Sequence, residues 1–186
     1  TLRRMAHLPK QLRAMKRILI LLLALMPVMA QAQNFHIENG QIKWQKVYDS
    51  DMTFAELHTA IVVSNDYEDI QVLDNCIMAT LKPVDYIPED YGFKYGNSNT
   101  LLLNGALGPI AVRIDVKEGK YRVTATNILV TRITSGGMIP LGYKSKIEDY
   151  ALKRGAPNKM MTEQFGPVFD KFLTRKTTFK KTDDDW

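Results

Sequence analysis

Residues 110–123 read Ile-Ala-Val-Arg-Ile-Asp-Val-Lys-Glu-Gly-Lys-Tyr-Arg-Val, the clearest β pattern in the chain. Apolar and polar side chains alternate over residues 110–117, which is the period-two pattern of a strand with one buried face. Glu118 and Gly119 supply a turn, after which apolar residues return on alternate positions. The pattern predicts a β-hairpin in an antiparallel sheet that is covered on one face only.

The second strand of this hairpin is expected over residues 120–131. Its alternation changes phase near Asn127, which predicts a β-bulge at that point. Two shorter strands are predicted earlier in the chain, at residues 69–73 and 76–81, because β-branched and other apolar residues alternate there with polar ones.

An N-terminal hairpin is predicted over residues 35–48, because Asn39-Gly40 is the preferred two-residue loop of a type I′ turn. Counting outward from the loop gives four cross-strand pairs: Glu38 with Gln41, Ile37 with Ile42, His36 with Lys43, and Phe35 with Trp44. One face of this hairpin is then apolar and the other polar, as in a sheet packed on one side.

Three helical segments follow from capping signals. Thr53 and Glu56 form a capping box at the start of a first helix, and Ser145 with Glu148 predicts a second, which Gly155 would end. Asn158 is expected to cap a C-terminal helix that kinks or restarts at Gly166-Pro167. The apolar residues of this last helix share one face: Met161, Phe165, Val168, Phe169 and Phe172.

Residues 82–108 are rich in Pro, Gly and Asn and are predicted to form a long loop. The order of hairpin, helix, strands and helices predicts an α+β domain, with helices on one face of an antiparallel sheet. We expect this single domain to span residues 33–179 and residues 180–186 to form a charged tail.

Residues 15–32 have the features of a cleavable export signal: two basic residues, a short leucine-rich run and an Ala-Gln-Ala processing motif. Cleavage would leave a mature chain that begins near Gln33, with residues 1–14 upstream of the signal. The alternative is a retained membrane anchor, but the apolar run breaks at Pro27, short of the roughly 20 residues that cross a bilayer.

Removal of this leader changes the charge of the protein. The whole chain carries 25 Lys and Arg against 20 Asp and Glu, but six of the basic residues and none of the acidic ones lie in residues 1–32. The mature chain would therefore carry a charge of about −1, which removes the electrostatic basis for nucleic-acid binding. Cys76 is the single cysteine, so no intramolecular disulfide can form.

A search for catalytic or metal-binding motifs predicts none. His36 and His58, the two histidines of the mature chain, have no partner at a zinc-ligand spacing. The chain has no Gly-x-Ser-x-Gly nucleophile motif and no phosphate-binding glycine loop, so no catalytic residue, metal or cofactor is expected. Asp49 and Asp51 precede the first helix, where acidic residues favour its positive end.

The candidate binding residues lie on the outer sheet face and in the loop. Arg113 and Arg122 face outward on the predicted hairpin, and the aromatic residues of the loop add stacking area: Tyr91, Phe93 and Tyr95. An open sheet with an aromatic loop can recognise a peptide, a glycan or a partner protein. The alternative is an ordinary solvated sheet face.

The strand-turn-strand at residues 116–123, with Ile42-x-Trp44-x-x-Val47-Tyr48 ahead of a helix, resembles a family of exported bacterial domains. That family is known as a domain of unknown function with a TBP-like fold. The resemblance implies a curved antiparallel sheet with helices on one side and a Gram-negative periplasmic or surface setting. It implies no catalytic residues, and a TBP-like shape does not by itself imply DNA binding.

These observations predict a non-enzymatic exported binding or accessory domain of the cell envelope. Its partner would be an unknown protein, peptide or glycan, without nucleic acid and without stable membrane insertion after cleavage. Its location would be the periplasm, or else the cell surface or medium. One alternative is an envelope-acting hydrolase, which a site joining Asp85, Glu89 or Asp90 to Arg113 would favour. Another is a structural subunit that pairs through a sheet edge.

Overall fold

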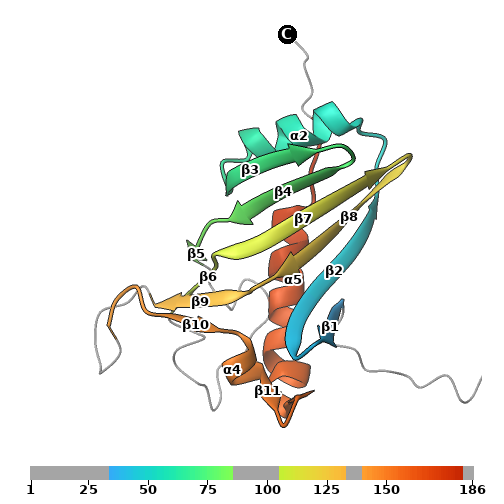
Figure 1. The fold of residues 1–186 in the computed structure, drawn as a ribbon. Helices are drawn as coiled ribbons and strands as arrows, with labels where there is room; N and C mark the ends of the chain where they lie inside the picture. The colour runs from blue at the N-terminus through green and yellow to red at the C-terminus, as the bar shows by residue number, and fades with distance from the viewer. Residues whose placement is uncertain (1–33, 86–104, 133–139, 182–186) are drawn as a thin grey trace, which may run out of the picture. The chain divides into compact units, whose positions relative to one another are not determined.

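The computed structural model describes residues 34–85, 105–132 and 140–181, all within the compact unit Gln31–Trp186. Its main layer is a curved, six-stranded, fully antiparallel sheet (Figure 1). The strand order is β1 (Phe35–Glu38), β2 (Gln41–Asp49), β8 (Lys120–Thr126), β7 (Ile110–Lys117), β4 (Cys76–Leu81) and β3 (Tyr67–Leu73). The α+β class predicted from the sequence is confirmed.

Both predicted hairpins form. β1 and β2 pair in the expected register, from Glu38 opposite Gln41 to Phe35 opposite Trp44. In β7 and β8 the residues expected to face inward are buried: Ile110, Val112, Ile114, Tyr121, Val123 and Ala125. Val116 is partly buried and packs against this core. One face of the sheet therefore supplies the hydrophobic core.

Helices cover this inner face, with α5 (Gly166–Thr177) crossing behind the central strands in Figure 1. α2 (Phe54–Val63) begins with the predicted capping box, in which Thr53 accepts from the Glu56 backbone and Glu56 accepts from the Thr53 N–H. Leu57 and Ile61 of α2 are buried in the same core as the face of α5. No helix among the described residues is long and apolar enough to span a membrane.

The long strand expected over residues 120–131 is instead two strands. β8 ends at Thr126, Asn127 adopts a positive φ of 49°, and β9 (Leu129–Arg132) continues in a second sheet. The phase change near Asn127 thus marks a transfer between sheets rather than a bulge, because the chain turns there and buries Ile128.

The second sheet also corrects the limits of the predicted loop. Its strand order is β10 (Lys144–Lys146), β9, β6 (Gly105–Leu107) and β5 (Val84–Asp85). Both ends of the expected 82–108 loop are therefore strands, too short to show a period in the sequence. The rest of that loop lies outside the described residues.

The capping box expected at Ser145 was wrong. Ser145 is buried within β10, opposite Val130 of β9, and its Oγ accepts from the Tyr150 hydroxyl. Glu148 does not reach back to cap a helix, because its Oε1 accepts from the Ile42 N–H of β2. Only a short helix forms, α4 (Glu148–Ala151). Gly155 then lies in the turn of a small hairpin, β11 (Leu152–Lys153) and β12 (Ala156–Pro157).

The C-terminal helix begins as predicted, with Asn158 Oδ1 accepting from the Met161 N–H at 2.9 Å. The expected break at Gly166-Pro167 is a π-helical segment, η2 (Met161–Phe165), in which the Gly166 N–H donates to the Met161 carbonyl. Because Pro167 has no N–H to donate, a widened turn replaces the kink and lets the chain continue directly into α5.

Hydroxyl groups from the sheet satisfy the last carbonyls of α5. Tyr67 donates to the Lys176 carbonyl at 2.9 Å and Tyr121 to the Thr177 carbonyl at 3.0 Å, while Tyr48 contacts the Thr177 side chain. Burial raises the pKa of Tyr121 to about 12 and also raises the pKa values of Tyr48 and Tyr67. Two of the orphan carbonyls at the helix end are thus paired without a capping glycine.

Candidate functional site

The outer face of the six-stranded sheet, which we call the open face, is the candidate site. Strand register sets two rows of outward positions across it: Val47, Arg122, Asp115 and Cys76 in one, and Gln45, Thr124, Arg113 and Met78 in the next. Cys76 is buried, whereas both arginines, Val47 and Met78 are exposed.

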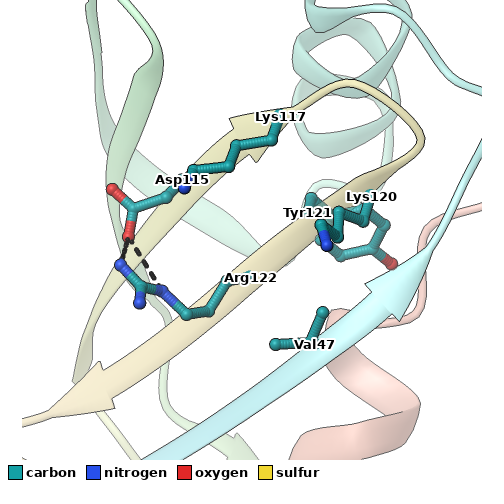
Figure 2. A pocket seen from close by; sticks show the side chains of 6 residues that line it. All are labelled: Val47, Asp115, Lys117, Lys120, Tyr121 and Arg122. Carbon is teal, nitrogen blue, oxygen red and sulfur yellow. Dashed lines mark hydrogen bonds and ion pairs between the residues drawn. The ribbon is translucent and has the colours of Figure 1, made fainter.

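Asp115 holds the two predicted arginines together. Its Oδ1 accepts from Arg113 Nε at 2.8 Å, and its Oδ2 accepts from Arg122 Nη2 at 2.8 Å and Nε at 3.3 Å. Figure 2 shows Arg122 reaching from β8 to Asp115 on β7, with Val47 nearby on β2. The carboxylate side chain is 18% exposed, against 55% for Arg113 and 50% for Arg122.

The electrostatics of this cluster favour the charged forms of Asp115 and Arg113. Partial burial opposes ionisation of Asp115, but the hydrogen bonds from Arg122 and Arg113 outweigh it and lower the pKa of the carboxyl group. Hydrogen bonding to Asp115 raises the pKa of the Arg113 guanidinium. Two cations therefore remain fixed at one point on the open face.

Each guanidinium keeps donors that its contact with Asp115 does not use. Arg113 donates to Asp115 through Nε, which leaves both of its Nη groups, and Arg122 leaves Nη1. A guanidinium presents planar donors that match a carboxylate or phosphate, often in a bidentate pair. The cluster can therefore accept an anionic group from solution while Asp115 holds the arginines in place.

Two shallow hollows flank the cluster. One has a volume of about 150 Å³ and is lined by Val47, Asp115, Lys117, Lys120, Tyr121 and Arg122 (Figure 2). The other is about 200 Å³, on the β4 side, and its lining includes Gln71, Met78, Thr80 and Arg113. Sites that enclose a small molecule usually measure about 300–1,000 Å³, so these hollows suit contact with a chain lying across the surface.

A larger hollow of about 570 Å³ lies at the rim, between the start of α2 and the β7–β8 turn. It is lined mainly by Asp51, Met52, Thr53 and Phe54 on one side and Val116, Lys117, Glu118 and Gly119 on the other. The helix end beside it is already capped by its own Thr53 and Glu56. We therefore place the candidate site on the open face rather than at the rim.

The structure brings together two of the five residues singled out from the sequence. Arg113 and Arg122 meet on Asp115, whereas Tyr91, Phe93 and Tyr95 lie outside the described residues. His36 is exposed and His58 half-buried, and the described part of the chain contains no cluster of His, Cys, Asp and Glu suited to a metal ion.

Sequence reasoning missed the apolar residues beside the arginines. Val47 is 55% exposed and Met78 is 41% exposed, one on each side of the β7–β8 hairpin. Alternation along each strand places both side chains on the outward face. Their nearness to the arginines depends on β2 pairing with β8 and β4 with β7, and local patterns carry no signal for such pairing.

Comparison with known proteins finds similar solved structures but no similar sequence. Neither a family model nor a curated protein matches the sequence. A TBP-like protein from Parabacteroides distasonis is similar in structure, with a TM-score of 0.44 and 13% identity over 78% of this chain and 91% of that one. A DUF4468 family protein from Bacteroides ovatus has a TM-score of 0.41 and 17% identity over 81% of this chain and 82% of that one. Neither description names a ligand.

Proposed function

We propose that this chain is a non-enzymatic binding or accessory domain of the bacterial cell envelope, and that its binding surface is the open face. The observation that supports this most directly is the Asp115 cluster, which holds Arg113 and Arg122 in place at the surface and leaves them donors that Asp115 does not use. Fixing two long side chains before binding reduces the entropy that a ligand would otherwise have to offset.

The position of the cluster favours binding of an extended partner. It lies on central strands between two shallow hollows, and exposed Val47 and Met78 provide apolar area on either side. Charged anchors with neighbouring apolar contacts are a common arrangement at protein interaction surfaces. The partner would be a protein, peptide or glycan of the envelope.

The proposal includes export, which rests on the signal-like sequence of residues 15–32. We expect the full chain, expressed in a Gram-negative host, to appear in the periplasmic fraction. Its intact mass should match a protein that begins near Gln33. Recovery of the uncleaved chain from the envelope would contradict this part of the proposal.

The binding function is tested by capture from envelope extracts with the processed protein. We compare it with an Arg113→Gln/Arg122→Gln variant and with Lys144→Gln/Lys146→Gln, which removes the same charge from exposed positions of β10. At least one component should be retained by the wild type and the β10 variant and lost by the arginine variant. Equal capture by all three proteins would reject the open face as the binding surface.

The hydrolase alternative stays a prediction from the sequence. Of the carboxylates considered for it, Asp85 lies in β5 of the four-stranded sheet, whereas Arg113 belongs to the six-stranded sheet. Glu89 and Asp90 lie outside the described residues. Release of soluble fragments from envelope polymers by the purified protein, without any captured component, would favour this alternative.

A further inference from the structure

The cations of the open face follow the β7–β8 hairpin in regular steps, a feature that we call the cationic ladder. Arg113 occupies one cross-strand pair, Arg122 the next, and Lys117 lies opposite Lys120 in the third. Each step is two residues along the strand, and all four side chains belong to exposed residues. Two residues of antiparallel strand span about 7 Å, so the backbone positions that carry these cations recur at about that interval.

This interval equals the repeat of side chains on one side of an extended peptide, which also advances about 7 Å for every two residues. An extended chain lying along the hairpin could therefore present one side chain to each step of the ladder. A helical segment advances only 1.5 Å per residue and would not keep this match.

The charge of the ladder selects an acidic partner. Its four cations are opposed by Asp115 within the ladder, by Asp49 of β2, which pairs with Lys120, and by Asp69 of β3, which lines the hollow beside Arg113. The surplus of about one positive charge lies on a protein whose mature net charge is close to neutral. Carboxylates would also match the unused Nη groups of Arg113 and Arg122.

The surroundings of the ladder favour a peptide over another anionic polymer. Val47 and Met78 flank it and offer contacts to aliphatic side chains. Single-stranded nucleic acid is usually bound with exposed aromatic residues on which bases stack. Among the residues that line the two hollows, the aromatic one is Tyr121, which faces the core and is only 3% exposed.

Building on the proposed function, we propose that the ligand of the open face is an acidic peptide segment in extended conformation, with carboxylates at every second residue along the cationic ladder. Arg113 and Arg122 each bind one carboxylate through their free Nη groups, and Lys117 with Lys120 binds the third. The intervening side chains point away from the ladder, and neighbouring apolar groups contact Val47 or Met78.

The test uses a capped seven-residue peptide with aspartate at positions 2, 4 and 6. Two matched peptides serve as controls: one with asparagine at the same positions, and one with the three aspartates in a single block. By fluorescence anisotropy with the processed protein at low salt, we expect the alternating peptide to bind at least tenfold more tightly than the asparagine peptide. We also expect it to bind several-fold more tightly than the block peptide.

Substitutions in the protein test whether the alternating peptide binds at the cationic ladder. Arg113→Gln/Arg122→Gln should weaken binding at least tenfold, Lys117→Gln/Lys120→Gln should weaken it several-fold, and Lys144→Gln/Lys146→Gln should leave it within twofold. Circular dichroism and urea unfolding confirm that each variant is folded. An unchanged affinity in both ladder variants would overturn the proposal.

An oligouronate and a single-stranded oligonucleotide of equal charge complete the test. Tighter binding of either one than of the alternating peptide would overturn the peptide assignment. If envelope capture depends on the two arginines but the acidic peptide does not compete with it, the proposed function stands and this inference fails. If the arginines affect neither measurement, both fail.

Discussion

Two aspartates of this protein bind their partners in opposite environments. Asp170 of α5 is 6% exposed, and its Oδ1 accepts from Trp44 Nε1 at 2.8 Å and from Asn34 Nδ2 at 2.6 Å. Asp115 forms a comparable number of hydrogen bonds on the open face, where its arginine partners are half exposed. Burial, rather than the number of contacts, should therefore determine what each carboxylate contributes to stability.

Asp170→Ala should lower the free energy of unfolding by about 1–3 kcal/mol, because it leaves the buried indole N–H of Trp44 without an acceptor. Urea unfolding followed by circular dichroism measures the change. A loss below about 0.5 kcal/mol would show that the hydrogen bond to Trp44 is dispensable for stability.

Asp115→Asn should change the same quantity by less than about 1 kcal/mol, since exposed ion pairs contribute little in water. The urea midpoint should stay close to that of the wild type. A destabilisation as large as that of Asp170→Ala would mean that the arginine cluster is part of the structural framework rather than a surface feature.

The tyrosines beneath the end of α5 predict a loss of stability in alkali. Burial raises the pKa of Tyr121 from 10.0 to about 12 in the folded protein, so the folded state retains a proton that the unfolded chain has released. This contribution to stability is complete below about pH 10 and is lost as the pH rises towards 12. Urea unfolding at about pH 8, 10 and 11.5 should show the decline, and Tyr121→Phe should make it shallower.

At the level of single elements, turns and caps were predictable where a few adjacent residues determine the geometry. Asn39-Gly40 fixed the register of β1 on β2, and Thr53 with Glu56 fixed the start of α2. The similar motif at Ser145 gave a wrong prediction of a capping box. Pairing of β10 with β9 buries this serine, and Glu148 accepts a hydrogen bond from β2, far away in the sequence. A local motif cannot predict a competing partner that lies far away in the sequence.

Thr53→Ala should destabilise the protein by about 1 kcal/mol, because it removes the side chain that accepts the Glu56 backbone N–H. Thr59→Ala, at an exposed position within the same helix, is the matched control and should be neutral or slightly stabilising. Thermal unfolding of the two variants in parallel distinguishes a capping effect from a general effect on the helix.

Gly108 joins β6 of the second sheet to β7 of the first, and its φ of +125° is unfavourable for other residues. A Cβ atom there would lie 2.9 Å from the Lys82 carbonyl oxygen, so Gly108→Ala should cost about 1–3 kcal/mol. Gly119→Ala is the control, since Gly119 also has a positive φ but a Cβ atom there would have no neighbouring atom within 4 Å. Equal losses in urea unfolding would show that backbone conformation alone matters at Gly108.

On the scale of the whole molecule, the sequence predicted one sheet with a covered and an open face, and it placed Arg113 and Arg122 on the open one. Both predictions, the two faces of the sheet and the positions of the two arginines, follow from alternation within a single hairpin. The second sheet could not be predicted, because β5, β6 and β10 have only two or three residues each and are held by partners elsewhere in the chain. The nearness of Val47 to the arginine cluster depends in the same way on non-local strand order.

The sheet edges predict that the protein is a monomer. β3 forms one edge, and its pairing with β4 is interrupted between Glu68 and Gln71, where Asp69 has a positive φ of 53°. Such a bulge hinders the addition of another strand, and the opposite edge, β1, has only four residues. Light scattering on the processed protein should give the mass of one chain at micromolar concentration. A dimer that dissociates when β3 is altered would support the structural-subunit alternative.

The bond between Trp44 and Asp170 joins residues 126 positions apart, and α5 follows every strand of the sheet in chain order. While the polypeptide emerges from the ribosome, the part of the apolar sheet face that α5 covers stays exposed until this last helix is made. Nascent chains should therefore remain incompletely folded through most of translation. A polypeptide that completes its folding so late can pass through a translocation pore that admits only unfolded protein. This agrees with the export that we propose.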